Sequence, residues 1–172
     1  MHTPDDDAAA REAVHDRAVR RPLRRLLTLT AATGVLSALA TAGVLTLQGL
    51  PGYVRTVLEA RSWGQVEVTD ADVAVFLTPS WGVPAAVAGV LAATALLVLG
   101  VARRVRATRP LGTVAVGLGL LTAAFWMVDG GRMVRAGGAG PLVLAAVVAM
   151  FVACAGWLLV AHLRTTRDAF EG

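Results

Sequence analysis

Four long stretches of this sequence contain no Asp, Glu, Arg, Lys or His. They run over residues 26–47, 83–101, 111–128 and 141–161. Each is close to the ~20 residues that a helix rising ~1.5 Å per residue needs to cross a ~30 Å hydrocarbon core. A helix of that length in a soluble bundle would carry a polar stripe, whereas these stretches are apolar all round. The sequence therefore predicts four transmembrane segments.

The predicted segments are helices rather than strands. Lipid leaves every unpaired backbone group unsatisfied, and the runs are too long for barrel strands of ~10 residues. The chain is 56% hydrophobic and 16% charged, whereas soluble domains carry about 25% charged residues. We therefore expect an all-α membrane protein, a four-transmembrane-helix bundle with an extracytoplasmic loop containing short interfacial helices.

The arginines predict the orientation of this bundle. All sixteen basic residues are arginine, and twelve of them lie on one face of a four-span topology. These twelve are Arg11, Arg17, Arg20, Arg21, Arg24, Arg25, Arg103, Arg104, Arg106, Arg109, Arg164 and Arg167. Basic loops stay in the cytoplasm, so both termini are predicted to be cytoplasmic in a bacterial cytoplasmic (plasma) membrane. The net charge of +4 then reflects membrane topology and attraction to anionic lipid headgroups. No nucleic-acid partner is predicted.

These spans divide the chain into three parts. Residues 1–25 form a cytoplasmic tail and basic juxtamembrane segment, with 1–16 expected to be mobile; residues 26–163 form the transmembrane domain, and residues 164–172 a second tail. Paired arginines before the first span and Ala38-Leu39-Ala40 within it resemble a cleavable export signal. The apolar run continues to Leu47, which favours a retained span and leaves cleavage as the alternative.

The loop over residues 48–80 is the largest segment predicted outside the bilayer. Residues 53–62 have the spacing of an interfacial amphipathic helix, and residues 65–69 alternate like a short strand. Thr69 is a predicted N-cap for a helix over residues 70–77, and capping explains Asp70 and Asp72 without a bound cation. Trp63, Trp126 and Trp157 are expected to anchor the protein at the membrane interfaces.

A polar cluster is predicted at the outer end of the third span. Residues 129–140 form a short, glycine-rich and flexible connection. Asp129 and Arg132 have the i, i+3 spacing of a helical ion pair, although Gly130-Gly131 weakens the case for a continuing helix. Arg55 or Arg61 of the first loop are alternative partners for Asp129 and would close that loop over the bundle.

Small residues recur every four positions in each span, and we expect these columns to face other helices. Helices in lipid associate through close packing, which small side chains permit. The columns are Gly34, Ala38 and Ala42; Ala85, Gly89 and Ala93; Ala115, Gly119 and Ala123; and Ala145, Ala149 and Ala153.

Reactive chemistry is sparse in this sequence. Ion and proton pathways use ionisable groups within the membrane, and the four predicted cores have none. Cys154 is the single cysteine, so thiol exchange within one chain is excluded and packing is its expected role. His2, His15 and His162 do not form a ligand set. We therefore predict no catalytic residue, metal site or cofactor.

These features predict a non-enzymatic accessory or structural subunit of a membrane complex, with another membrane protein or a second copy as partner in the lipid bilayer. The alternative is a small-molecule or lipid transporter with a site between the helices under the outer loop. A polar path for it would use Thr28, Thr30, Thr33, Ser37, Thr41 and Thr46 of the first span. Helical threonines also bond their own carbonyls, which is the structural explanation. A third option, a lipid-acting enzyme, requires Asp70, Asp72, Arg55 and Arg61 to converge.

Overall fold

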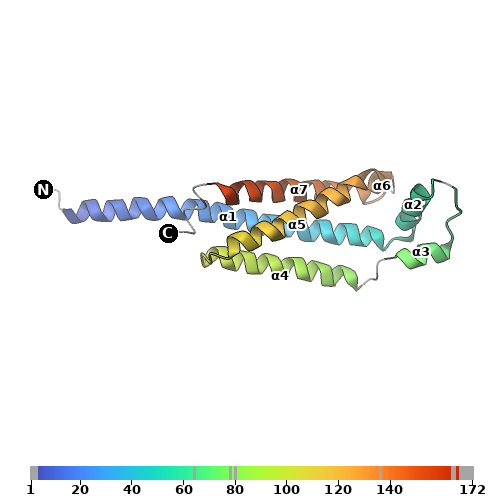
Figure 1. Cartoon of the computed structure of the whole chain (residues 1–172), viewed down its shortest axis with the longest axis horizontal. Coiled ribbons are helices and arrows are strands. Elements are labelled where there is room, and N and C mark those ends of the chain that lie inside the picture. Colours follow the sequence, from blue (N-terminus) through green and yellow to red (C-terminus); the bar gives the residue numbers. More distant parts are fainter. Residues whose placement is uncertain are drawn as a thin grey trace.

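A computed structural model of the chain describes residues 4–63, 65–77, 79, 81–135, 137–163 and 166, with side chains from Leu23 onward. Every regular element in these ranges is a helix, and four are long and apolar enough to cross a membrane. The chain is thus a multi-pass membrane protein with a four-helix bundle, as predicted (Figure 1). The helices are α1 (Pro4–Gln48), α2 (Pro51–Arg61), α3 (Asp70–Phe76), α4 (Gly82–Ala102), α5 (Thr108–Val128), α6 (Gly130–Arg135) and α7 (Gly140–His162).

The first helix is much longer than its span. Its apolar part is Leu23–Gln48, while the part before Leu23 extends beyond the other helices (Figure 1). The segment expected to be a mobile tail is thus helical from Pro4, because its alanines favour helix and proline suits a first turn. We call the end of the bundle with Leu23, the α4–α5 turn and His162 the basic end. The opposite end, with α2, α3 and α6, is the loop end.

Helix α1 lies at the centre of the bundle. It packs against α4 on one side and α7 on another, while α5 packs mainly on α7 (Figure 1). Helix α5 begins beside the basic end of α4 and runs diagonally to α6 and α7 at the loop end. Since α4 and α5 make few contacts with each other, a gap remains between them that side chains fill only in part.

Close contact between α1 and α7 builds the core. Ala40 and Val44 of α1 and Val147 of α7 are at most 1% exposed. A Cβ atom at Gly43 would lie 2.9 Å from Cγ2 of Val143, which is closer than real Cβ contacts allow. Glycine is therefore what lets these two helix backbones approach each other.

The small-residue columns lie in different surroundings. Gly34, Ala38 and Ala123 are buried, and a Cβ atom at Gly34 would overlap the side chain of Thr94 on α4. Ala42, Gly119, Ala149 and Ala153 are half-buried, whereas Ala85, Gly89, Ala93, Ala115 and Ala145 are exposed. The columns of α1 and α5 thus contain the buried contacts between helices, while that of α4 is exposed.

Helices α2 and α3 lie at the loop end, and an ion pair between Arg55 and Asp70 joins them. Tyr53 and Val54 of α2 are buried, as is Val73 of α3. The N-cap is confirmed: the Thr69 hydroxyl accepts from the Asp72 backbone N–H at 3.3 Å, and the Asp72 carboxylate accepts from the Thr69 N–H at 2.9 Å. The strand expected over 65–69 is wrong, because this segment has no partner strand and is irregular.

The connection between α5 and α7 is not a simple flexible link. The helix resumes as α6 directly after Asp129, and the chain then turns through Gly137 and Gly138, whose φ values are +69° and +55°. These positive values favour glycine because it lacks a Cβ atom. At Gly140 a Cβ atom would overlap the backbone carbonyl of Met133, so glycine is needed where α6 meets α7.

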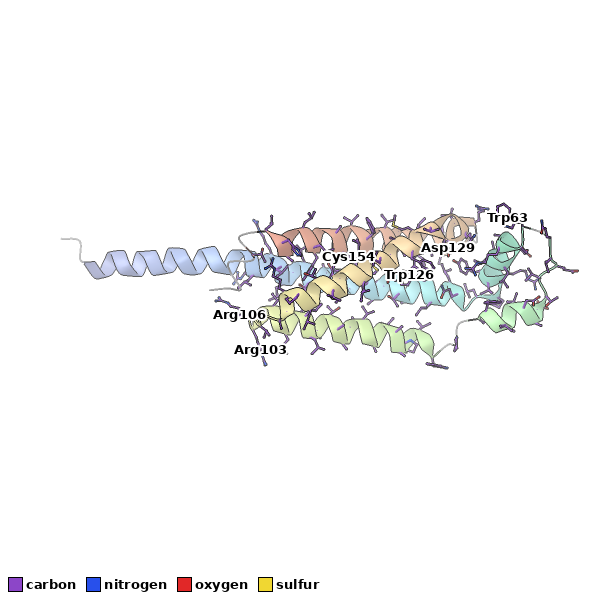
Figure 2. The ribbon with its side chains drawn as sticks, viewed as in Figure 1. Trp63, Arg103, Arg106, Trp126, Asp129 and Cys154 are labelled. Carbon is purple, nitrogen blue, oxygen red and sulfur yellow. The ribbon has the colours of Figure 1, made fainter. Side chains whose placement is uncertain are left out.

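Trp157 differs from its predicted placement, whereas Trp63 does not. Trp157 is 1% exposed and lies inside the bundle rather than at an interface. Its indole N–H donates to the Thr30 hydroxyl at 2.8 Å, which satisfies a polar atom that lipid could not. Trp63 is 88% exposed and lies at the loop end (Figure 2).

Candidate functional site

A cleft of about 260 Å³ lies within the bundle, with walls from all four spans. Its most distinctive feature is a row of hydroxyls in otherwise apolar surroundings. Thr30, Thr33, Ser37 and Thr41 of α1 form one wall, Thr94 comes from α4, and Thr122 comes from α5. The cleft lies where α4 and α5 contact each other little, and its lining residues Ala93, Ala115, Leu118 and Thr122 are exposed.

Helical periodicity places four α1 hydroxyls on one face. At about 100° per residue, positions 30, 33, 37 and 41 fall within roughly 80° around the helix axis. Thr28 and Thr46 lie about 160° away from Thr30 on the same wheel. Both are exposed outside the cleft, and the Thr28 hydroxyl donates to the Arg24 carbonyl at 2.6 Å. The polar path predicted from six residues is therefore divided between two faces.

Most of the cleft hydroxyls already have hydrogen-bond partners. Thr30 donates to the Leu26 carbonyl at 2.7 Å, and Thr33 donates to the Ala153 carbonyl of α7 at 3.4 Å. Thr94 and Thr122 bond carbonyls one turn earlier in their own helices. These bonds satisfy the donors and leave oxygen lone pairs that can accept a further bond.

Thr41 differs from these hydroxyls. Its residue is 9% exposed, and no hydrogen bond of its hydroxyl is found among the described residues. Since no buried side-chain oxygen of these residues lacks a partner, the Thr41 oxygen is accessible from the cleft. A hydroxyl facing an apolar space loses free energy unless it finds a partner. Thr41 is therefore the cleft atom best suited to bind a polar group of a ligand.

Met150, Cys154 and Trp157 of α7 line the wall opposite α4. Cys154 is fully buried and lies midway along α7 (Figure 2). The position of Gly119 on α5 is tight, since a Cβ atom there would lie 3.4 Å from the Cys154 sulfur. The thiol is thus enclosed by packed neighbours, in accord with the packing role expected for it.

The chemistry of the cleft is binding chemistry. No carboxylate, imidazole or guanidinium is among its lining residues, so it has no general acid, general base or charged ligand for an ion. Among the described residues, no group of three or more His, Cys, Asp or Glu side chains could hold a metal. Hydroxyls and polarisable sulfur atoms in an apolar space suit a lipophilic molecule with a hydrogen-bonding group.

The predicted polar cluster at the loop end is only partly assembled. Asp129 and Arg132 form an ion pair, because α6 continues the helix and brings them together. Arg61 and Asp129 line a second pocket of about 250 Å³ together with Gln48 and Tyr53. Arg55 lies elsewhere: it pairs with Asp70 and donates to the Val68 carbonyl, so it joins α2 to α3.

Tyr53 lies beside this loop-end pocket. Burial raises the pKa of its phenol, and the negative charge of Asp129 raises the pKa further, while Arg132 and Arg61 act in the opposite direction. The phenol therefore stays protonated at neutral pH and is available as a hydrogen-bond donor. Asp72 remains in its capping box, so the described residues do not form the convergent set that a lipid-acting enzyme would need.

Two parts of the cleft were not predicted. Thr94 and Thr122 received no role, although each is a hydroxyl inside an apolar span, which is a signal that sequence alone offers. The bond between Trp157 and Thr30 joins residues 127 positions apart, so no local pattern could indicate it.

Comparison with known proteins adds no further assignment, because no family model, no curated protein and no solved structure matches this chain.

Proposed function

We propose that this protein binds a lipophilic small molecule or lipid in the cleft and carries it within or across the membrane. The observation that supports this proposal is the Thr30, Thr33, Ser37 and Thr41 face of α1, which lines an intramembrane cleft. A purely structural bundle gains nothing from a hydroxyl such as Thr41 beside an apolar space, since that hydroxyl is costly without a partner. The absence of carboxylate, imidazole and guanidinium groups from the cleft lining favours an uncharged or weakly polar binding region.

Entry from the bilayer between α4 and α5 would suit such a ligand. Helices α4 and α5 contact each other little, so a molecule dissolved in the bilayer would reach the hydroxyls without crossing water. The ligand would then bury its apolar part against Val116 and Leu97, and it would donate a hydrogen bond to, or accept one from, Thr41. This route defines the ligand class as amphipathic and membrane-soluble.

A cleft-filling variant tests this proposal. Ala93 lines the cleft and is exposed, so Ala93→Leu adds volume there. Ala92 is the matched control, because it is also exposed on α4 but does not line the cleft. Native mass spectrometry of protein released from its own membranes would detect a co-purified small molecule.

We expect the wild type and Ala92→Leu to retain the same added mass and Ala93→Leu to lose it. Equal retention by all three proteins, or no added mass on the wild type, would contradict binding in the cleft. Thermal unfolding of each variant in detergent shows whether the bundle is intact.

The second candidate is the accessory or structural subunit. It is favoured by the exposed small face of α4, where a Cβ atom at Gly89 would meet no atom within 4 Å. A partner helix, or a second copy of this chain, would approach such a face closely. Mild-detergent affinity purification with native mass spectrometry tests this role. A stoichiometric partner or homo-oligomer that is lost in Gly89→Leu supports it, and elution as a monomer contradicts it.

The proposed orientation places the basic end in the cytoplasm of a bacterial cell. It follows from the arginines beside Leu23 and in the α4–α5 turn, since basic loops are retained on the cytoplasmic side. In a Cys154→Ala background, the single-cysteine variants Arg106→Cys and Trp63→Cys lie at opposite ends of the bundle (Figure 2). A membrane-impermeant maleimide applied to intact cells should label the cysteine at 63 and not the one at 106, and the reverse pattern would invert the topology.

A further inference from the structure

A third pocket, of about 250 Å³, lies between α1 and α4 at the basic end. Its lining residues are Leu23, Arg24, Leu27, Val101, Ala102 and Arg104. The apolar part of α1 begins at Leu23, and that of α4 ends at Ala102. The pocket is therefore level with the boundary of the hydrocarbon region, where lipid headgroups meet acyl chains.

The pocket has an apolar floor and a basic rim. Val101 is 1% exposed and Leu23 is 8% exposed, so both are fixed in the packing between α1 and α4. Arg24 and Arg104 are exposed, one from each side of the pocket. Among the side chains that the structure describes, neither guanidinium is paired with a carboxylate. An amphipathic anion matches both halves of this pocket.

The backbone conformation of Arg104 separately indicates that its side chain has a role at the pocket. Its φ of +53° lies in the left-handed region, which is unfavourable for a residue with a Cβ atom and which glycine adopts freely. This residue follows the C-cap of α4, a position where glycine is the usual choice. An arginine there positions a guanidinium at the pocket rim at the expense of backbone stability.

We propose that this pocket binds an anionic phospholipid. The phosphodiester lies between the guanidinium groups of Arg24 and Arg104, and one acyl chain runs along Leu23, Leu27 and Val101. Arginine forms charge-assisted hydrogen bonds with phosphate oxygens, and basic pockets between membrane helices suit such headgroups. The lipid would act as a fixed contact between α1 and α4, at a place distinct from the hydroxyl-lined cleft.

The test uses the full chain in detergent. Unfolding is followed through exposure of the buried Cys154 thiol to a fluorogenic maleimide, with dioleoyl phosphatidylglycerol or dioleoyl phosphatidylcholine added at equal concentration. Native mass spectrometry counts the bound lipid. We expect phosphatidylglycerol, and not phosphatidylcholine, to raise the unfolding temperature of the wild type. Arg24→Gln and Arg104→Gln should each bind phosphatidylglycerol about fivefold more weakly.

Arg103→Gln is the matched control, because it removes the same charge from the same turn but does not line the pocket. It should respond to phosphatidylglycerol like the wild type. Equal weakening by Arg103→Gln would show a diffuse basic surface and overturn the proposal. An equal response to both lipids would also overturn it.

A third ligand separates a lipid from a soluble anion. Inorganic phosphate offers the same charged oxygens without an acyl chain and should leave the unfolding temperature unchanged. An equal shift with phosphate would overturn the lipid assignment.

Arg104→Gly removes the guanidinium and the backbone strain together, so its lipid-free stability should equal or exceed that of the wild type. Its response to phosphatidylglycerol should nevertheless be reduced, which rules out misfolding as the cause.

Discussion

Helices α4 and α7 are both strongly apolar spans of similar length, yet they are packed differently. In the most apolar stretch of α7, 28% of the residues are buried, compared with 6% in α4. Helix α7 contacts both α1 and α5, whereas α4 packs mainly on α1. The difference shows that two spans of equal apolar character have different roles: α7 belongs to the core, and α4 borders the cleft and presents its far side to lipid.

The hydrogen bonds of the cleft hydroxyls also differ between α7 and α4. Trp157 on α7 is bonded to Thr30 inside the core, while Thr94 on α4 bonds only its own helix at the edge of the cleft. Bonds between helices fix the position of α7 relative to α1. Helix α4 lacks such a bond among the described residues, so we expect it to be the helix that moves when the cleft admits a ligand.

The largest effect should come from crowding the α1–α7 contact. Gly43→Leu would force side-chain atoms into Val143, so we expect a loss of about 1–3 kcal/mol in the free energy of unfolding. Gly89→Leu on α4 meets open space and should leave the stability of the purified protein almost unchanged. Thermal unfolding in detergent checks both variants, and equal losses would remove the distinction between α7 and α4.

A second, smaller effect should follow from the core hydrogen bond. Trp157→Phe removes the N–H that Thr30 accepts together with part of the buried ring, and we expect the hydrogen bond to account for about 1 kcal/mol of the loss. In the Thr30→Val background the same substitution should cost much less, because the bond is already absent. A double-mutant cycle of unfolding free energies measures this coupling, and additive losses would contradict it.

The loop-end ion pair should contribute less again. Helix α5 leaves α4 and meets α6 and α7 at the loop end, where Asp129 pairs with Arg132. We expect Asp129→Asn to lower stability by up to about 1 kcal/mol, since the pair is only partly buried. Glu59→Gln is a control on an exposed residue of the same end. An unfolding temperature unchanged by Asp129→Asn would show that this pair does not hold α5 in place.

The smallest effect should be a local response to acid near α4. Hydrogen bonds from the side chain and then the backbone of Thr69 lower the pKa of Asp72 below its usual value near 4. A lowered pKa means that the carboxylate stabilises α3 above pH about 4 and ceases to do so as the pH falls through the folded-state value. Hydrogen exchange, corrected for its intrinsic pH dependence, should show α3 loosening in acid while α7 stays protected. Loosening of both helices together would mean that the loop end and the core are not independent.

Much of the fold could be predicted from the sequence. The four spans, the α2 helix and the Thr69 cap follow from runs and spacings within one segment, and each is present in the structure. The predicted strand over 65–69 failed because a strand needs a partner that periodicity cannot supply. The prediction of a flexible link over residues 129–140 was only partly correct. Packing of Met133 stabilises α6, and the glycines of this segment do not indicate that packing.

The candidate site was less predictable. The α1 hydroxyls were identified from their residue type, and the helical wheel separates Thr28 and Thr46 from the rest without any structure. Thr94, Thr122 and Cys154 join them only because three other helices are arranged around α1. Residues from distant parts of the chain meet through packing that no local pattern encodes.

The sequence by itself determined that this chain crosses a membrane four times as helices, because transfer of apolar side chains into lipid and internal pairing of the backbone depend on each segment alone. The tertiary structure decided which apolar faces became core, cleft or outer surface. Lipid tails are as apolar as leucine, so hydropathy cannot distinguish a helix-facing residue from a lipid-facing one. Only the fit of Gly43 to Val143, or of Trp157 to Thr30, makes that distinction.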